Sequence, residues 1–223
     1  MTPRAALPIL GLLMLILLGG CGTKTGILIP PKADAQFVSL FNGTTLEGWE
    51  GDPKWFRVED GAIVAGSLDR LVPDTVFLST TRDYHNFDLT YEVKLVGSRE
   101  RGNGGVQIRS QRIADSTHVR GYQVDVGQHY WGRLYDESRR RKILTDLPEY
   151  FSIDMDVNHG GWNRYRVWVY DDNIKIWLND TLVADYNETD PAIVREAGFI
   201  AVQAHAGPPT EIWYRDLLIR ELD

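Results

Sequence analysis

The residues best suited to chemistry occupy alternate positions in several short apolar segments. On the polar side of these segments are amides, carboxylates, a guanidinium and an imidazole: Glu92, Gln107, Arg109, Gln123, Asp125, Gln203 and His205. Successive side chains of a β-strand point to opposite faces of the sheet, so each of these residues faces away from the apolar side of its strand. If the strands are neighbours, the polar side chains line one sheet face. Such a face suits a polyhydroxylated ligand, because each sugar hydroxyl both donates and accepts hydrogen bonds.

His205 has the clearest catalytic potential of this set. It ends an apolar strand just before a Gly-Pro-Pro loop, and an imidazole can act as an acid or a base near neutral pH. Trp131, Tyr135 and Trp162 lie near predicted loops and are candidate platforms for stacking on sugar rings. A structural interpretation stays open for each residue, since the polar ones can form a solvated sheet face and the aromatic ones can fill the core.

Common catalytic and metal-binding motifs do not occur in the sequence. There is no HExxH or paired-cysteine pattern, which disfavours a tight zinc site, although scattered carboxylates could bind Ca²⁺ or another divalent ion. There is also no GxSxG, Walker or strand-linked GxGxxG motif. We interpret the basic run at residues 139–142 as a solvated loop without a chemical role.

The elements that must position these residues are predicted to be short antiparallel strands. Apolar and polar residues alternate with period two, and the turns between them are rich in Gly, Pro, Asn and Asp. We expect strands at 55–58, 62–65, 76–79, 87–95, 105–110, 121–126, 164–170, 174–178, 198–205 and 211–222, with one short helix at 190–196. This pattern predicts an all-β fold, a two-sheet antiparallel jelly-roll sandwich, with a β-barrel as the alternative.

Length and charge restrict the class of protein. The chain has 223 residues, 43% of them hydrophobic, and a formal net charge of -7. One domain of this size can bury an adequate core without disulfides. The acidic balance argues against a nucleic-acid partner, which normally requires a basic surface.

The N-terminal residues look like a removable targeting segment. Residues 1–20 contain a short apolar stretch and end in Gly-Gly before Cys21, the only cysteine in the sequence. The pattern is typical of a lipoprotein signal peptide with Cys21 as the lipidated residue; an ordinary secretory signal is the alternative. Residues 21–36 then form a flexible tether to a domain at 37–223. These features predict a lipid-anchored protein of the bacterial cell envelope, on the periplasmic or outer-membrane face, which contacts the membrane through its lipid alone.

Short motifs in a fixed order along residues 37–222 also carry a family resemblance. They are Phe41-Asn42-Gly43, Gly48-Trp49, Tyr84-His85-Asn86-Phe87-Asp88-Leu89, Asn103-Gly104-Gly105-Val106-Gln107-Ile108-Arg109, Gly121-Tyr122-Gln123-Val124-Asp125, Gly132-Arg133-Leu134-Tyr135 and the run from Gly198 to His205. This order resembles the bacterial 3-keto-disaccharide hydrolase family (3-keto-glucoside 1,2-lyase/3-keto-2-hydroxyglucal hydratase). The sequence departs from the family pattern at Gly104, Gln123, Asp180 and Asp216, where Ser, Glu, Gly and Asn are usual.

The resemblance implies a concanavalin/laminin-G-like jelly roll that acts on 3-keto-glucosides, by hydrolysis or by elimination and hydration. A C3 ketone acidifies the C2 proton, so a base can form an enolate that expels the C1 substituent. Arg109, with or without a metal ion, suits the enolate oxygen, and His205, Asp125 or Glu92 suits the base or acid. The remaining candidates bind substrate: Gln107, Gln123, Gln203, Trp131, Tyr135 and Trp162.

Two further functions remain open at this stage. The same face could belong to a non-catalytic carbohydrate-binding lipoprotein, an alternative that the amide at Gln123 favours, or to a structural module of the envelope. If the protein is the enzyme, a separate sugar 3-dehydrogenase must supply its substrate, because the sequence has no nucleotide-binding motif.

Overall fold

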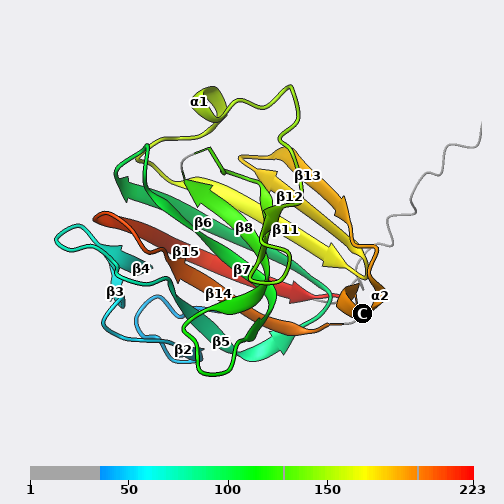
Figure 1. The fold of residues 1–223 in the computed structure, drawn as a ribbon, viewed down its shortest axis with the longest axis horizontal. Helices are drawn as coiled ribbons and strands as arrows, with labels where there is room; N and C mark the ends of the chain where they lie inside the picture. The colour runs from blue at the N-terminus through cyan, green and yellow to red at the C-terminus, as the bar shows by residue number, and fades with distance from the viewer. Residues whose placement is uncertain (1–35, 128, 195) are drawn as a thin grey trace, which may run out of the picture. The chain divides into compact units, whose positions relative to one another are not determined.

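Two antiparallel β-sheets pack face to face in the computed structural model, which describes residues 36–223 except residues 128 and 195 (Figure 1). The predicted signal peptide (residues 1–20), Cys21 and residues 22–35 of the predicted tether lie outside the described residues. Within the described part of the chain, no helix is long and apolar enough to cross a membrane.

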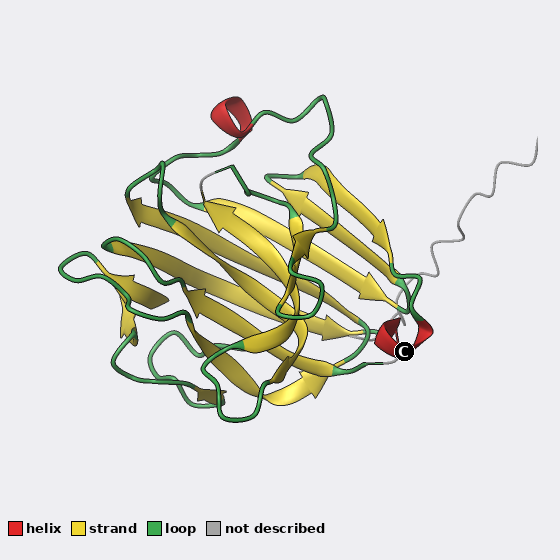
Figure 2. Ribbon diagram, in the orientation of Figure 1, coloured by secondary structure: helices red, strands yellow, loops and turns green. Residues whose placement is uncertain are grey.

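Sheet A has eight strands and sheet B has seven. The order in sheet A is β13 (Thr181–Asn187), β12 (Asn173–Leu178), β11 (Asn163–Tyr170), β6 (Phe87–Gly97), β15 (Thr210–Glu221), β4 (Ala62–Ser67) and β3 (Phe56–Glu59), and β1 (Val38–Ser39) also pairs with β15. The order in sheet B is β10 (Lys142–Ile143), β9 (Leu134–Glu137), β8 (Val119–Gly127), β7 (Asn103–Arg112), β14 (Gly198–Ala204), β5 (Val76–Tyr84) and β2 (Trp49–Glu50). The helices α1 (Ile153–Asp156) and α2 (Pro191–Val194) are single short turns (Figure 2).

The core lies between the sheets and follows the predicted alternation. On β6, Phe87, Leu89 and Val93 are fully buried, and Val167 and Ile176 continue the same apolar layer on β11 and β12. Each sheet therefore has one face in the core and one outer face, as expected when two amphipathic sheets bury their apolar sides against each other. The predicted all-β, two-sheet antiparallel sandwich is confirmed.

Several elements escape the sequence prediction. The strands β1, β2, β9, β10 and β13 were not expected, and α2 covers only part of the helix predicted at 190–196. β1, β2 and β10 have two residues each, too few to show an alternation. β9 carries Asp136 on its inner side, where the pattern calls for an apolar residue. The missed strands β9 and β10 lie beside the candidate site.

A bulge in β7 changes the face on which Arg109 lies. The pairing of β7 with β8 shifts register between Ile108 and Gln111, and Arg109 has a φ of 45°. An extra residue in one strand reverses the alternation beyond it. Gly121 on β8 makes room for the bulge, since a Cβ there would lie 2.1 Å from the Ser110 hydroxyl oxygen. The prediction that Arg109 shares a face with Gln107 is therefore wrong.

Arg109 instead ties together the turns at one end of the sandwich. The side chain is 2% exposed and donates hydrogen bonds to the backbone oxygens of His85 (2.6 Å) and Asp171 (2.7 Å) and to Asn86 Oδ1 (2.9 Å). Burial lowers the pKa of Arg109 to about 10, so the guanidinium stays charged at neutral pH. Val194 of α2 also lies at this end, where its backbone oxygen contacts the His85 ring at 2.9 Å. Arg109 is a structural residue of this end.

We predict that Arg109→Met destabilises the fold. The substitution removes a buried guanidinium and leaves two partly buried backbone oxygens without their donor, which costs about 3 kcal/mol of the free energy of unfolding. Urea unfolding measures this loss, with Arg101→Met as the matched control at an exposed arginine. If Arg109→Met is as stable as the wild type but inactive, Arg109 takes part in the reaction and is not a structural residue.

Candidate active site

A pocket of about 490 Å³ opens on the outer face of sheet B. Its lining is mostly polar and comes from β8, β9, β10, the start of β7, the end of β14 and nearby loops: Thr75, Asn103, His118, Gln123, Asp125, Tyr130, Tyr135, Glu137, Arg141, Lys142, Ile143, Gln203 and His205. The volume lies within the usual range for small-molecule sites.

The structure brings together a large part of the predicted polar face. Gln123, Asp125, Gln203, His205 and Tyr135 all line the pocket. They meet there because β9, β8, β7 and β14 are consecutive in sheet B, which is the neighbour relation that the sequence could only assume.

Hydrogen bonds join the side chains of the pocket floor and lead towards Asp125. Gln107 is fully buried, and its Nε2 donates to Gln123 Oε1 at 2.7 Å. Gln203 Nε2 donates to the same oxygen at 2.8 Å. Gln123 Nε2 then donates to Asp125 Oδ1 at 2.7 Å. Because Gln123 Oε1 is held by two donors, its amide is oriented with the nitrogen towards Asp125.

Asp125 is the residue whose ionisation the pocket changes most clearly. It is 5% exposed, and burial raises its pKa to about 8, with a further rise from the charge of Glu137. The hydrogen bond from Gln123 and the charge of Arg133 oppose the shift but are weaker. A carboxyl with this pKa is mostly neutral at pH 7, so Asp125 can donate a proton that an ordinary aspartate has already lost.

His205 presents one free ring nitrogen. Its Nδ1 lies 2.6 Å from the backbone oxygen of Ala206. A carbonyl oxygen can only accept, so Nδ1 must carry the hydrogen, and in the neutral ring Nε2 is the unprotonated nitrogen. The contact therefore fixes the tautomer that can act as a base through Nε2.

The rim contains residues that the sequence analysis missed. Tyr130, Glu137, Arg141 and Lys142 come from β9, β10 and adjoining turns, whose short strands gave no periodic signal. Tyr135, the candidate stacking platform, lines the pocket, and burial is the main cause that raises its pKa, so its hydroxyl stays protonated at neutral pH.

The basic run at residues 139–142 is divided between two environments. Arg139 donates to Asp136 at 2.9 Å, and Arg140 pairs with Glu188 at 2.6 Å. Arg141 and Lys142 line the pocket instead. The interpretation as a solvated loop is wrong for Arg139 and Arg140, which are partly buried and paired, whereas Arg141 and Lys142 are exposed.

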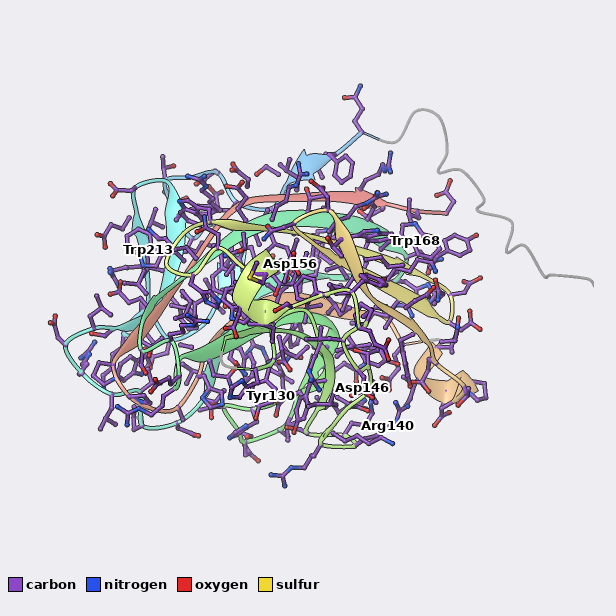
Figure 3. All side chains as sticks on the ribbon, turned by 90° about the horizontal axis from the view of Figure 1, so that it is seen from above. Tyr130, Arg140, Asp146, Asp156, Trp168 and Trp213 are labelled. Atoms are coloured by element: carbon purple, nitrogen blue, oxygen red, sulfur yellow. The ribbon has the colours of Figure 1, made fainter. Side chains whose placement is uncertain are left out.

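Glu92 and Trp162 lie on the opposite layer. Glu92 is on β6 of sheet A, where it pairs with Arg215 at 2.6 Å, and the Arg215 guanidinium lies 4.0 Å from the Trp162 ring centroid. Figure 3 shows Trp213, a neighbour of Trp162, on the side of sheet A and Tyr130 on the other side. The prediction that Glu92 shares a face with Gln107 and that Trp162 stacks above it is wrong, because β6 belongs to sheet A.

Trp131 is also displaced from its predicted place. It is 3% exposed, belongs to the main apolar core and makes an edge contact with His159 at 6.5 Å. It lines a separate cavity of about 160 Å³ with Leu95 and His159. The alternative that Trp131 fills the core therefore applies.

Buried tyrosines of sheet A support the pocket floor from below. Tyr165 Oη donates to the backbone oxygen of Asp125 at 3.0 Å, and Tyr214 Oη donates to that of Gly105 at 3.1 Å. Gly105 and Asp125 are paired residues of β7 and β8. A side chain at Gly105 would displace Gln123, since a Cβ there would lie 2.8 Å from Gln123 Cγ. Two hydrogen bonds from sheet A therefore hold the backbone beneath the pocket floor.

The pocket does not assemble an obvious metal site. Among the described residues, no group of three or more His, Cys, Asp or Glu side chains is placed to hold a metal ion.

The chain belongs to the 3-keto-α-glucoside-1,2-lyase-like domain family, whose model matches residues 36–220. This agrees with the family resemblance found in the sequence. A comparison with curated proteins finds no match.

Solved structures share the fold at low sequence identity. A candidate glycosyl hydrolase from Parabacteroides distasonis is 23% identical, with a TM-score of 0.62 over 84% of this chain and 94% of that one. A carbohydrate-binding module from Bacillus subtilis is 15% identical (TM-score 0.58, 82% and 100%), and a Bacillus licheniformis β-glucanase is 9% identical (TM-score 0.57, 85% and 98%). The predicted concanavalin-like jelly roll is thus confirmed. The family to which the chain belongs indicates a carbohydrate-active protein.

We predict that Asp125→Asn changes how stability depends on pH. In the wild type, the folded carboxyl keeps its proton up to pH about 8, whereas the unfolded one loses it near 3.8. The wild-type free energy of unfolding should therefore fall between these values, by up to about 1.4 kcal/mol per pH unit from this group. The Asn variant lacks this loss, so its stability relative to wild type should rise from pH 5 to pH 8.

Chemical denaturation at several pH values measures this difference. Asp172→Asn, which removes an exposed carboxyl, is the matched control. A constant difference between Asp125→Asn and wild type over this range would show that burial does not raise the pKa of Asp125.

Proposed function

We propose that the protein cleaves the glycosidic bond of 3-keto-glucosides in the sheet B pocket, by elimination followed by hydration. The observation that carries this proposal is the pairing, in one pocket, of a carboxyl with a pKa of about 8 and an imidazole whose Nε2 is free. Family membership supports the 3-keto-glucoside as substrate.

His205 acts as the base. Its Nε2 takes the C2 proton, and the electron pair of the C2–H bond moves towards the C3 carbonyl to form an enolate. When the enolate collapses, the C1–O bond breaks, and the departing oxygen takes the proton held by the imidazolium. Water then adds at C1 and a proton returns to C2, which leaves a 3-keto sugar and a free alcohol.

Asp125 and Tyr135 stabilise the negative charge that develops on the C3 oxygen. The neutral carboxyl of Asp125 and the phenol of Tyr135 both donate at neutral pH, since burial raises both pKa values. Donors placed for a developing oxyanion usually make the largest single contribution to such a reaction. This pair takes the place that the sequence analysis gave to Arg109.

A carbohydrate-binding protein without catalysis is the second candidate. The central side chain of the floor, Gln123, is an amide where the family usually has glutamate, so one potential acid or base is missing. The remaining pair, His205 and Asp125, favours catalysis, because a binding site has no need for a carboxyl held neutral.

We further propose that the protein works at the bacterial cell envelope, anchored by a lipid on Cys21. The support is the sequence of residues 1–21, a short apolar stretch that ends in Gly-Gly-Cys. The 3-keto substrate would come from a separate sugar 3-dehydrogenase.

We predict that His205→Ala and Asp125→Asn each lower kcat on a 3-keto-glucoside by about 100-fold or more. The wild-type rate should fall as the pH rises through about 8, because ionised Asp125 no longer donates and repels the enolate. Glu92→Gln is the matched control and should keep full activity, since Glu92 lies on sheet A. NMR analysis of products with time gives both rate and reaction course.

The second candidate has a separate signature in the same experiment. If calorimetry detects binding of the glycoside but no product forms over hours, the protein is a carbohydrate-binding protein and not an enzyme. Unchanged rates in both His205→Ala and Asp125→Asn would remove the catalytic scheme.

We predict that Cys21→Ser moves the protein from the membrane fraction to the soluble fraction of bacterial cells, because the serine cannot be lipidated in the same way. Fractionation and immunoblotting measure the shift, and mass spectrometry of the wild-type N-terminus detects the lipid. A wild-type protein that fractionates as soluble, with an unmodified Cys21, would rule out the anchor.

A further inference from the structure

Almost every basic side chain of the described residues has a partner. Ion pairs, hydrogen bonds or aromatic rings engage the arginines and lysines of both sheets, for example Arg166 with Asp88 and Lys94 with Trp213. Within residues 36–223, leaving aside residues 128 and 195, no such contact is found for the side chains of Arg101, Arg141 and Lys142. Arg141 and Lys142 line the sheet B pocket, whereas Arg101 does not.

The β9–β10 hairpin places Arg141 at the pocket in an unusual conformation. Arg141 has a φ of 54°, a region that residues other than glycine seldom adopt, and its backbone nitrogen donates to the Asp136 oxygen at 2.9 Å. Its neighbour Arg140 pairs with Glu188 on the far side of the hairpin. The charge of Arg141 is felt in the pocket, since it lowers the pKa of Tyr135, although burial and the charge of Glu137 raise that pKa by more.

The pocket lining does not neutralise these cations. The carboxylic residues of the lining are Glu137 and Asp125, and among the described residues neither forms an ion pair with Arg141 or Lys142. Asp125 is also mostly protonated at neutral pH. His118 already faces Asp74, at 3.3 Å. A protein with a net charge of -7 thus keeps unpaired positive charge at the rim of its pocket.

We propose that this rim binds an anionic group on the glycoside, with Arg141 as the residue that contacts it and Lys142 adding positive charge. The pocket then prefers acidic glycosides, in which the sugar or its aglycone carries a carboxylate or a sulfate. This inference rests on the proposed function only in placing the glycoside in the same pocket.

Chemistry and position favour this use of the cations. The planar guanidinium can donate two parallel hydrogen bonds to a carboxylate or sulfate. β10 lies two strands from β8, about 10 Å across the sheet, whereas Asp125 is on β8. Arg141 is therefore placed to contact a substituent at the edge of the ligand. Asp125 is placed to contact the sugar ring above the pocket floor.

Calorimetric titration with glycosides that lack the C3 ketone tests the inference without turnover. The probes are methyl glucoside, methyl glucuronide and methyl glucoside 6-sulfate. We expect at least one charged probe to bind about tenfold more tightly than methyl glucoside at low salt, and the preference to shrink in about 0.5 M salt. The two charged probes distinguish a carboxylate site from a sulfate site.

Variants assign the preference to Arg141. Arg141→Gln should bring the charged probes to within about twofold of methyl glucoside, and Arg141→Lys should keep part of the preference. Arg101→Gln, which removes an unpaired arginine outside the lining, is the matched control and should behave as wild type. Equal affinity of the wild type for all probes, absent binding of both charged probes, or an equal loss for neutral and charged probes in Arg141→Gln would overturn the inference.

The result separates this inference from the proposed reaction. Tight binding of a charged probe by a protein that leaves 3-keto-glucosides intact would support the inference and remove the catalytic proposal. Cleavage of 3-keto-glucosides without any preference for charged probes would do the reverse.

Discussion

A carboxyl buried on the outer face of sheet B is the constraint on which the candidate site depends. No cation forms an ion pair with Asp125 among the described residues, so burial dominates its ionisation and raises its pKa to about 8. Gln107 and Gln203 both donate to Gln123, which in turn donates to the carboxyl, and these hydrogen bonds offset part of the cost of burying the polar groups. A salt bridge in this place would have kept the carboxylate charged and removed its ability to donate a proton.

The rest of the sandwich holds these hydrogen-bonded side chains in place. Tyr165 and Tyr214 reach up from sheet A to the backbone of the paired residues Asp125 and Gly105. The bulge in β7 turns Arg109 towards the end of the sandwich, where it ties turns together. The same bulge leaves the pocket floor without a fixed guanidinium, which is compatible with a neutral Asp125. The core thus holds the backbone of Asp125 in place, and the bulge keeps the Arg109 guanidinium away from its carboxyl.

The two outer sheet faces show why composition alone does not define a site. Sheet A also carries acids and bases on its outer face, but they pair with each other: Asp88 with Arg166 and Arg220, and Glu92 with Arg215. The buried carboxylate of Asp88 is thus satisfied by two arginines, and the more exposed pair of Glu92 contributes little to stability. On sheet B the polar groups are amides and an uncompensated carboxyl beside unpaired cations at the rim. Unmatched charge, and not charge itself, distinguishes the pocket.

Sequence by itself determined the sandwich, the strand faces and the family, because period-two alternation and turn residues are local signals that a single chain displays directly. It also selected Gln107, Gln123, Asp125, Gln203 and His205, since each obeys the alternation of its own segment, and Tyr135 as an aromatic residue near a predicted loop. Only the tertiary structure decided that β6, with Glu92, belongs to the other sheet, that a bulge turns Arg109 away, and that Arg141 reaches the pocket. Strand order, register shifts and the folding of short hairpins depend on contacts between residues far apart in the chain, and alternation within one segment carries no record of them.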